Sequence, residues 1–292
     1  MKKVLIILII VVIAAAAVMA VGTKVNVYQD AKGIHFADRN SAEILSEKDT
    51  KVFNEIEIKT DSANIKFVTG DYFGYEFMAG STVDTTYSLA NKKLTITQKS
   101  KTMLFNLNLG SLKSDYITIY LPEEAILNNV TISDKSGTIT INKLNCENLD
   151  VSSVSGNDVI NSASASVISV DKTSGNIDMK NIKAGSLYMV LNSGNLNASG
   201  METGAVDIGQ TSGNVTMAGE LLGSSVISAV SGNINLNITG AKTDFNRDIS
   251  VTSGNVNVDG SQAKSNQYEN ANAVNSLKLK STSGNITVNF VK

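Results

Sequence analysis

The segment "KTSGNIDMKN" at residues 172–181 contains a Ser-Gly-Asn-apolar motif that returns at a fixed interval through the second half of the chain. Six glycines that directly follow a serine are spaced 19 residues apart, and two further copies of the motif follow at longer intervals. These glycines are Gly137, Gly156, Gly175, Gly194, Gly213, Gly232, Gly254 and Gly284. A fixed period of about this length is typical of a repeat architecture. The repeat therefore decides the fold before any local motif is considered.

The residues that follow each glycine alternate between apolar and polar. Asn comes directly after the glycine in seven copies, and Thr138 replaces it in the first; the seven are Asn157, Asn176, Asn195, Asn214, Asn233, Asn255 and Asn285. Apolar residues two apart, such as Ile177 and Met179, then predict a half-buried strand. The second copy departs from this pattern, because Asp158 and Val159 precede Ile160. A second apolar pair, such as Leu187 and Met189, follows ten positions later, so each repeat contains at least two short strands.

Stacking of successive repeats is the economical way to bury these apolar faces. A unit of 19 residues is too short for a strand, a crossover helix and a second strand. We therefore expect an all-β fold, a single-stranded parallel β-solenoid (β-helix) with coils of about 19 residues, spaced about 4.8 Å apart. In this fold the apolar residues at one phase of the repeat form a single inward column, as listed here: Ile177, Leu196, Val215 and Ile234.

We interpret the repeated Ser-Gly-Asn motif, called the corner below, as a structural turn. Glycine supplies a backbone conformation that costs other residues about 1–2 kcal/mol, and asparagine hydrogen-bonds locally and can form ladders along a stack. A calcium site would need recurrent acidic partners, which the corner lacks. The eight glycines and seven asparagines listed above are thus predicted structural residues, with no catalytic, cofactor or metal role. Gly284, in the last copy, is expected to tolerate substitution better than Gly213.

The N-terminus predicts a membrane anchor over residues 1–22. Lys2 and Lys3 precede an uninterrupted apolar run over residues 4–21. As a helix these 18 residues would cover about 27 Å of a hydrocarbon core roughly 30 Å thick. The lysines favour a cytoplasmic N-terminus, with the rest of the chain outside the cell membrane. The alternative is a signal peptide cleaved near Ala20, followed by secretion.

The rest of the chain divides by composition. Residues 23–52 are a polar spacer in which residues 38–49 could form a short helix, and residues 53–292 form the β-solenoid domain. Within it, residues 53–135 are expected to be N-terminal coils with hairpin insertions, and residues 136–292 the regular repeats. A degenerate corner with Ala63 in place of glycine occurs near the start of this domain.

Composition excludes several classes of function. The 25 basic and 27 acidic residues give a net charge of −2, which does not favour nucleic acid as a partner. Cys146 and His35 are the only residues of their kinds, so the sequence predicts no internal disulfide, metal site or His- or Cys-based catalysis. We expect no cofactor.

Four features together resemble the bacterial putative-adhesin family, a domain of unknown function with a β-helical fold. They are "FNEIEIKTDSANIKFV", the hairpin "NKKLTITQKS", "ITIYLPEEAILNNVTI" and the later "SGNI"-type corners, and the resemblance covers about residues 53–292. Members of that family carry an N-terminal membrane segment, and some are encoded beside cell-envelope stress systems. The resemblance implies architecture and location, but it supplies no catalytic or binding residues.

These observations favour a non-enzymatic, membrane-anchored extracytoplasmic solenoid that acts as an adhesin, an interaction protein or a scaffold. Its expected partners are the membrane, through the single helix, and a cell-wall glycan or an envelope protein. The alternative is a polysaccharide-processing β-helix enzyme of the envelope. Such an enzyme needs paired carboxylates, and the outer face of the second strand offers only scattered ones at Asp150, Asp171 and Asp207, with Tyr188 between them.

Overall fold

The computed structural model describes residues 25–30, 33–38, 43–80, 82–102, 105–108, 114–265, 267–269 and 272–291. Over these residues the chain is almost entirely strand, with one short 3₁₀ helix, η1 (Lys242–Asp244), so the all-β expectation is confirmed. The segment predicted to anchor the protein, residues 1–22, lies outside the described residues. Among the residues that are described, no helix has the length and apolar character needed to cross a membrane.

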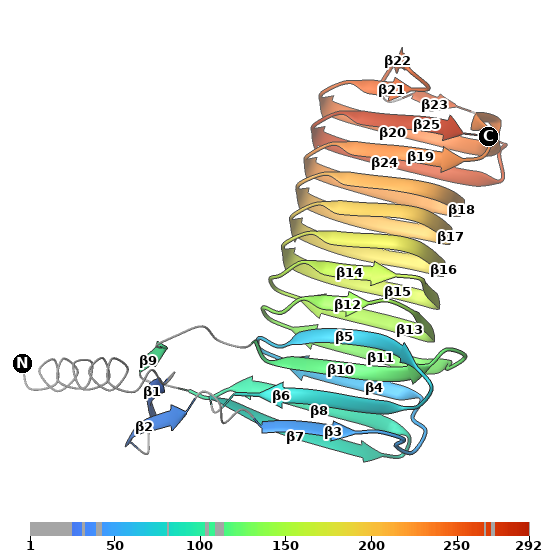
Figure 1. The fold of residues 1–292 in the computed structure, drawn as a ribbon. Coiled ribbons are helices and arrows are strands. Elements are labelled where there is room, and N and C mark those ends of the chain that lie inside the picture. The colour runs from blue at the N-terminus through green and yellow to red at the C-terminus, as the bar shows by residue number, and fades with distance from the viewer. Residues whose placement is uncertain are drawn as a thin grey trace, which may run out of the picture.

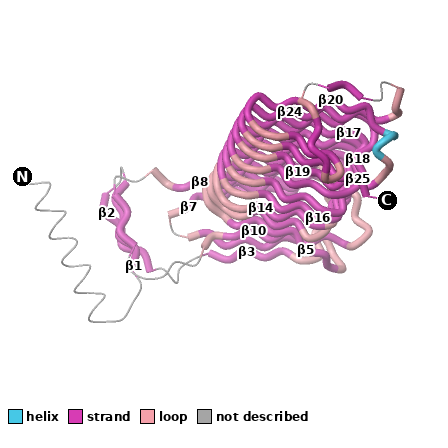
Figure 2. The backbone as a smooth tube through the Cα atoms, turned by 90° about the horizontal axis from the view of Figure 1, so that it is seen from above, coloured by secondary structure: helices cyan, strands magenta, loops and turns pink. Residues whose placement is uncertain are grey.

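Most strands belong to one tall, solenoid-like stack (Figure 1). Three long strands in its middle each form most of one coil: β16 (Ile177–Ser193), β17 (Leu196–Ser212) and β18 (Val215–Ser231). Neighbouring coils pair in parallel with a 19-residue offset, which brings Ile177 opposite Leu196 and Leu196 opposite Val215. The corners that separate the strands lie over one another along one side of the stack (Figure 2).

What we call the first face consists of the strands that follow a corner and of the strands that extend their sheet at both ends of the stack. Besides the opening segments of β16, β17 and β18, its members are, in spatial order, β3 (Glu43–Glu47), β6 (Gly74–Ala79), β10 (Tyr116–Pro122), β5 (Asn64–Gly70), β12 (Ile139–Ile141), β14 (Asp158–Asn161), then β19 (Ile234–Thr239), β25 (Ile286–Val291), β21 (Val256–Val258) and β22 (Ser261–Ala263).

The second face consists of the strands that precede a corner and of the strands that extend their sheet at both ends of the stack. Besides the closing segments of β16, β17 and β18, its members are, in spatial order, β7 (Val83–Ala90), β8 (Lys93–Ser100), β4 (Glu55–Thr60), β11 (Leu127–Asp134), β13 (Leu144–Ser153), β15 (Ala163–Ser174), then β24 (Asn275–Ser283), β20 (Phe245–Ser253) and β23 (Gln267–Glu269).

The core consists of columns of inward side chains, one from each coil. The predicted column is confirmed, because its four members pair in register and each is at most 1% exposed: Ile177, Leu196, Val215 and Ile234. A second buried column is mostly polar and lies three residues before Ala63 of the degenerate corner and before every corner glycine except Gly254. It contains Thr60, Asp134, Ser153, Lys172, Leu191, Gln210, Ala229 and Ser281.

Antiparallel strands occur at both ends of the stack, so the parallel arrangement expected from the repeat holds in its middle and not at its ends. At one end β3 and β10 run antiparallel to β6, and β7 runs antiparallel to β8. At the other end β22 and β23 run antiparallel to β21 and β20. A parallel coil leaves an unpaired strand edge at each end of a stack, and short antiparallel strands cover that edge at little cost in chain length.

The polar spacer expected at residues 23–52 contains strands. β1 (Val25–Asp30) pairs with β2 (Gly33–Asp38) and with β9 (Phe105–Asn108) in a separate three-stranded sheet. The expectation of a short helix at residues 38–49 is wrong over residues 43–47, because these residues form β3. Pairing with β6 supplies backbone hydrogen bonds that a short isolated helix would lack.

The order of coils at the C-terminal end differs from their order in the sequence. β24 pairs with both β18 and β20, and β25 pairs with both β19 and β21. The last corner in the sequence, at Gly284, therefore lies between the corners at Gly232 and Gly254. Gly284 is not at the end of the stack, and the expectation that it tolerates substitution better than Gly213 loses its basis.

Candidate binding groove

The corner glycines lie where successive coils approach most closely. Seven of the eight, all except Gly137, have a positive φ, with values of 121° at Gly213 and 148° at Gly284. A Cβ atom on Gly213 would overlap the carbonyl oxygen of Gly194, and one on Gly284 would overlap that of Gly232. Both the backbone conformation and the space at these positions therefore call for glycine.

The corner asparagines form a hydrogen-bonded ladder in spatial order. Each backbone N–H donates to the Oδ1 atom of the asparagine in the preceding coil, at 2.8–3.0 Å. The ladder runs through Asn157, Asn176, Asn195, Asn214, Asn233, Asn285 and Asn255. The side chains that the repeat singled out are thus engaged with one another and with the backbone of the stack.

The outward carboxylates of the second face are not brought together. Asp150 is in register with Ser169, and Asp171 is in register with Val190. Asp207 lies between Tyr188 and Val226. Among the described residues, no group of three or more His, Cys, Asp or Glu side chains is placed to hold a metal ion. The paired acids that glycoside hydrolysis requires are therefore not formed by these three residues.

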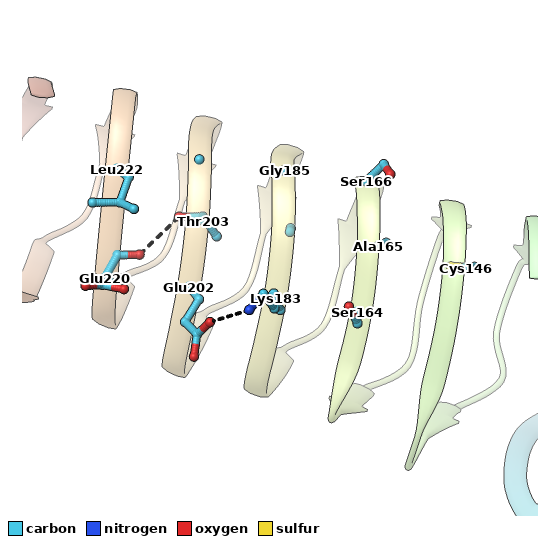
Figure 3. Close-up of a pocket in the computed structure, with 12 residues that line it drawn as sticks. Cys146, Ser164, Ala165, Ser166, Lys183, Gly185, Glu202, Thr203, Glu220 and Leu222 are labelled. Atoms are coloured by element: carbon cyan, nitrogen blue, oxygen red, sulfur yellow. Dashed lines mark hydrogen bonds and ion pairs between the residues drawn. The ribbon is translucent and has the colours of Figure 1, made fainter. Parts of the chain in front are cut away.

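A shallow groove runs along the stack where each coil turns from the first face to the second. It encloses about 650 Å³ and crosses coils contributed by β13, β15, β16, β17 and β18 (Figure 3). Since neighbouring strands lie about 4.8 Å apart, five coils give it a length of roughly 20 Å. An adjoining hollow of about 480 Å³ shares Lys183, Glu202 and Glu220 with it.

The groove owes its shape to a second set of turn residues with the same 19-residue spacing. Ser162, Asn181 and Gly200 all have positive φ, between 53° and 63°. Four positions after Asn181 and Gly200 come Gly185 and Gly204, where an added Cβ would lie 2.7 and 2.6 Å from a carbonyl oxygen of the preceding coil. Small residues thus form the floor because a side chain there would meet the neighbouring backbone.

The rim of the groove carries charged and hydroxyl groups. Lys183 and Glu202 form an ion pair of 3.2 Å, and their side chains are 73% and 59% exposed. Glu220 and Leu222 are exposed on the next coil, while Ser164 and Ser166 belong to the coil on the other side (Figure 3). The groove therefore offers hydrogen-bonding groups at every coil, spaced along a line.

Cys146 also borders the groove but is 7% exposed. Burial raises the pKa of its thiol to about 12, so the thiolate needed for nucleophilic chemistry is scarce at neutral pH. Cys146 thus packs as a small residue of the hydrophobic core. His35 lies in β2.

Sequence reasoning missed the groove, although a signal for it was present. Gly185 and Gly204 lie in the segments "NIKAGS" and "SGMETGA". They are 19 residues apart, which is the period of the corner. Their spacing could have predicted a second line of close approach between coils.

Comparison with known proteins gives a family match. The family model described as Toastrack DUF4097 matches residues 53–289, which is most of the chain. Among curated proteins no match was found.

Several solved structures are similar to the chain. They include a putative adhesin from Bacteroides fragilis, at 15% identity over 85% of this chain and 97% of that one, with a TM-score of 0.48. Another, from Parabacteroides merdae, has 13% identity over 86% of this chain and 97% of that one, with a TM-score of 0.46. A third, from Parabacteroides distasonis, has 15% identity over 86% of this chain and 98% of that one, with a TM-score of 0.44.

Proposed function

Because the chain belongs to the Toastrack DUF4097 family, we propose that it is a non-enzymatic, membrane-anchored protein of the cell envelope. In this proposal a single helix at residues 1–22 anchors the chain. The stacked domain lies outside the membrane as a β-solenoid, and its groove binds a linear glycan of the cell wall. The alternatives of secretion after cleavage near Ala20 and of an envelope protein as partner are outcomes of the tests below.

The sequence of the N-terminus supports anchoring. An apolar run of 18 residues directly after two lysines is long enough to span a bilayer with its N-terminus in the cytoplasm. It is also longer than the usual apolar region of a cleaved signal peptide.

The geometry of the groove is the observation that carries the ligand proposal. Its floor is kept shallow by glycines, and its rim repeats hydroxyl, ammonium and carboxylate groups from coil to coil. A binding site for a compact metabolite would converge on one point, as ligand pockets usually do. The polar groups of this groove instead lie along a line, as Ser164, Lys183, Glu202 and Glu220 on successive coils, and this arrangement suits an extended, hydroxyl-rich polymer.

The surface chemistry supports a role in binding over a role in catalysis. Lys183 and Glu202 are exposed and paired with each other, and Asp150, Asp171 and Asp207 are separated by other side chains. Hydrolysis of a glycosidic bond needs a general acid and a second carboxylate on either side of that bond.

Cell fractionation tests the anchoring. The intact protein should remain with the membrane, and protease added outside the cell should digest the stacked domain. Replacing Ile9 and Ile10 by arginine should weaken insertion, since an arginine at the centre of a spanning helix costs about 2.5–3.5 kcal/mol. A mature N-terminus at Val21 in the medium would establish secretion instead.

Co-sedimentation tests the groove, with the full-length protein in detergent and insoluble, purified cell-wall glycan as the probe. The double variant Lys183→Ala/Glu202→Ala should lose binding several-fold. The matched control is Asp178→Ala/Lys180→Ala, which removes one acid and one lysine from the exposed first face. Equal binding by both double variants would reject the groove as the glycan site.

The same incubations test catalysis. If soluble sugar fragments appear, and if Asp171→Asn or Asp207→Asn abolishes their release, the protein is a polysaccharide-processing enzyme and the binding role is wrong. We expect no soluble product.

A further inference from the structure

An ionic cluster is buried in the core beside the corners at Gly156 and Gly175. The Nζ atom of Lys172 lies 2.6 Å from Oδ2 of Asp158, and both side chains are 1% exposed. The Lys172 ammonium also donates to the hydroxyl of Ser153 at 2.7 Å. That hydroxyl donates to Oδ2 of Asp158 at 2.9 Å, and the N–H of Ile139 donates to Oδ1 at 3.2 Å.

The register explains how two charged residues came to lie inside. Asp158 pairs with Ile177, so it occupies the inward position that apolar residues hold in the other regular coils. Lys172 lies in the second inward column, between Ser153 and Leu191. Asp158 and Lys172 thus lie at the beginning and at the end of the same coil, and their side chains meet beside the corner.

A second carboxyl group adjoins this pair. Asp134 is 2% exposed and is in register with Ser153 in the same inward column. Its Oδ2 accepts a hydrogen bond from the N–H of Gly137, while its Oδ1 has no hydrogen-bond partner among the described residues. Burial raises the pKa of Asp134, and the charge of Asp158 raises it further. The cluster therefore combines one amine, one acceptor carboxyl and one carboxyl that favours its protonated form.

We propose that Lys172 and Asp158 condense spontaneously into an amide, an isopeptide bond that links the beginning of one coil to its end. The proposal stands independently of what the protein binds. The Lys172 ammonium first passes a proton to Asp158, which gives a neutral amine beside a neutral carboxylic acid. The lone pair of Nζ then forms a bond to Cγ of Asp158. The bond from Cγ to one oxygen breaks, and that oxygen leaves with its electron pair and with the second amine proton as water.

The balance of this step needs no other reactant. An ammonium and a carboxylate become one amide and one water, and nothing is oxidised or reduced. Asp134, whose pKa is raised by burial, is the group we assign to stabilise the oxygen charge that develops on Asp158 by reacting in its protonated form. Preorganisation and the exclusion of bulk water both favour a reaction held in this way.

The surroundings favour the amide over the ion pair. Two buried charges lose their hydration, and their mutual attraction offsets that loss only in part. A neutral amide removes both charges while keeping a carbonyl that can accept from Ile139 or Ser153. A chain whose single cysteine excludes an internal disulfide would thereby still have a covalent cross-link in its core.

Tryptic digestion of the purified full-length protein tests the proposal, because trypsin does not cleave after an acylated lysine. The linked protein should yield one fragment of residues 144–180, lighter than its sequence mass by one water molecule. An unlinked protein would yield the separate fragments 144–172 and 173–180. Recovery of fragment 173–180 in full yield from the folded protein would overturn the proposal.

The exposed pair of Lys183 and Glu202 is an internal control. It is also an ion pair, at 3.2 Å, but it is solvated, so cleavage after Lys183 should be complete in the same digest. Chain captured in denaturant directly after cell-free synthesis should give the two separate fragments, since the unfolded chain does not hold Nζ against Cγ.

Two variants assign the roles. Asp158→Ala should restore complete cleavage after Lys172, and a persisting link would show that another carboxyl is the acceptor. Asp134→Asn should slow the appearance of the linked fragment after folding. An unchanged rate in Asp134→Asn would reject the role of Asp134, while the mass of the wild-type fragment still decides the link itself.

Discussion

Single positions in this protein are constrained by the coil above and the coil below more than by their neighbours in sequence. Gly213 illustrates this, because its missing side chain is required by the carbonyl oxygen of Gly194, one coil away. Asp158 does so too, since its carboxylate accepts a hydrogen bond from the N–H of Ile139 in the preceding coil and the residue pairs with Ile177 in the next coil. A change at one position is therefore felt along the stack.

Cys146 should be protected from alkylation in the native protein. Its thiol is buried and its pKa is raised to about 12, so little thiolate is available at neutral pH. We expect iodoacetamide to leave Cys146 unmodified in buffer and to modify it fully in denaturant, as mass spectrometry can show. Rapid modification of the folded protein would mean that the groove wall opens at Cys146.

Glu57 should give the protein an acid-sensitive contribution to stability. Hydrogen bonds from Lys59 and Lys93 lower the pKa of Glu57 from 4.5 to about 2. A carboxyl whose pKa is lower in the folded state stabilises that state above pH 4.5 and loses this effect as the pH falls towards 2. Because both lysines are partly exposed, the effect is limited to about 1 kcal/mol or less.

Urea unfolding of Glu57→Gln tests this contribution. The variant should be less stable than the wild type at pH 7, and the difference should shrink steadily as the pH falls from 4.5 towards 2. A difference that grows on acidification would contradict the assignment.

The burial of the ionic cluster could have been predicted from the sequence, but the contact between its residues could not. Asp158 occupies a position that is apolar in the other regular copies, and from the sequence alone it is only a departure from the pattern. The 19-residue period alone places Asp158 and Lys172 inside, since their equivalents Ile177 and Leu191 are inward. Their mutual contact, however, depends on side-chain reach across a corner, which a repeat period does not contain.

Among the strands, the middle of the stack was predictable and the ends were not. The inward column from Ile177 to Ile234 follows from periodicity, because every coil there has the same length and the same neighbours. At the ends the partners are antiparallel strands such as β7 and β22, which carry no repeat signal. Their pairing is set by the need to cover a strand edge, a requirement of the whole stack.

Valine substitutions at the corner test the spatial order of the coils. Gly213→Val and Gly284→Val should each cost at least about 1–2 kcal/mol from the backbone conformation alone, and more from the overlap with the adjacent carbonyl. Gly254→Val should cost less than either, because its corner is the outermost and fewer coils depend on it. Thermal unfolding of the three variants gives the ranking.

Gly209→Val is the matched control for these variants. Gly209 belongs to the same coil as Gly213, has no positive φ, and has nothing within 4 Å of the position of an added Cβ. We expect a change within about 0.5 kcal/mol. If Gly284→Val proved milder than Gly254→Val, the coils would be stacked in sequence order, against the pairing of β24 with β18 and β20.

The strands β24 and β25 lie inside the C-terminal end of the stack and not at its outer edge. β24 and β25 are inserted between coils that precede them in the sequence, so β20 and β21 lack their inner partner strands until residues 275–291 are in place. In most solenoids each new coil can add to the coils already formed. Here the C-terminal layers can assemble only after synthesis reaches β25.

Hydrogen exchange should therefore follow spatial order and not distance from the chain terminus. Backbone amides of residues 275–291 have partner strands on both sides, while β20 and β21 have on their outer side only the three-residue strands β23 and β22. Exchange measured by mass spectrometry should show residues 275–291 as protected as residues 215–239, with residues 245–258 exchanging earlier. Fast exchange of residues 275–291 would instead indicate a frayed C-terminus. The last strands would then lie on the outside of the stack. Because opening of the inner layer must first release β20 and β21, protection of the final residues measures the stability of the entire C-terminal end.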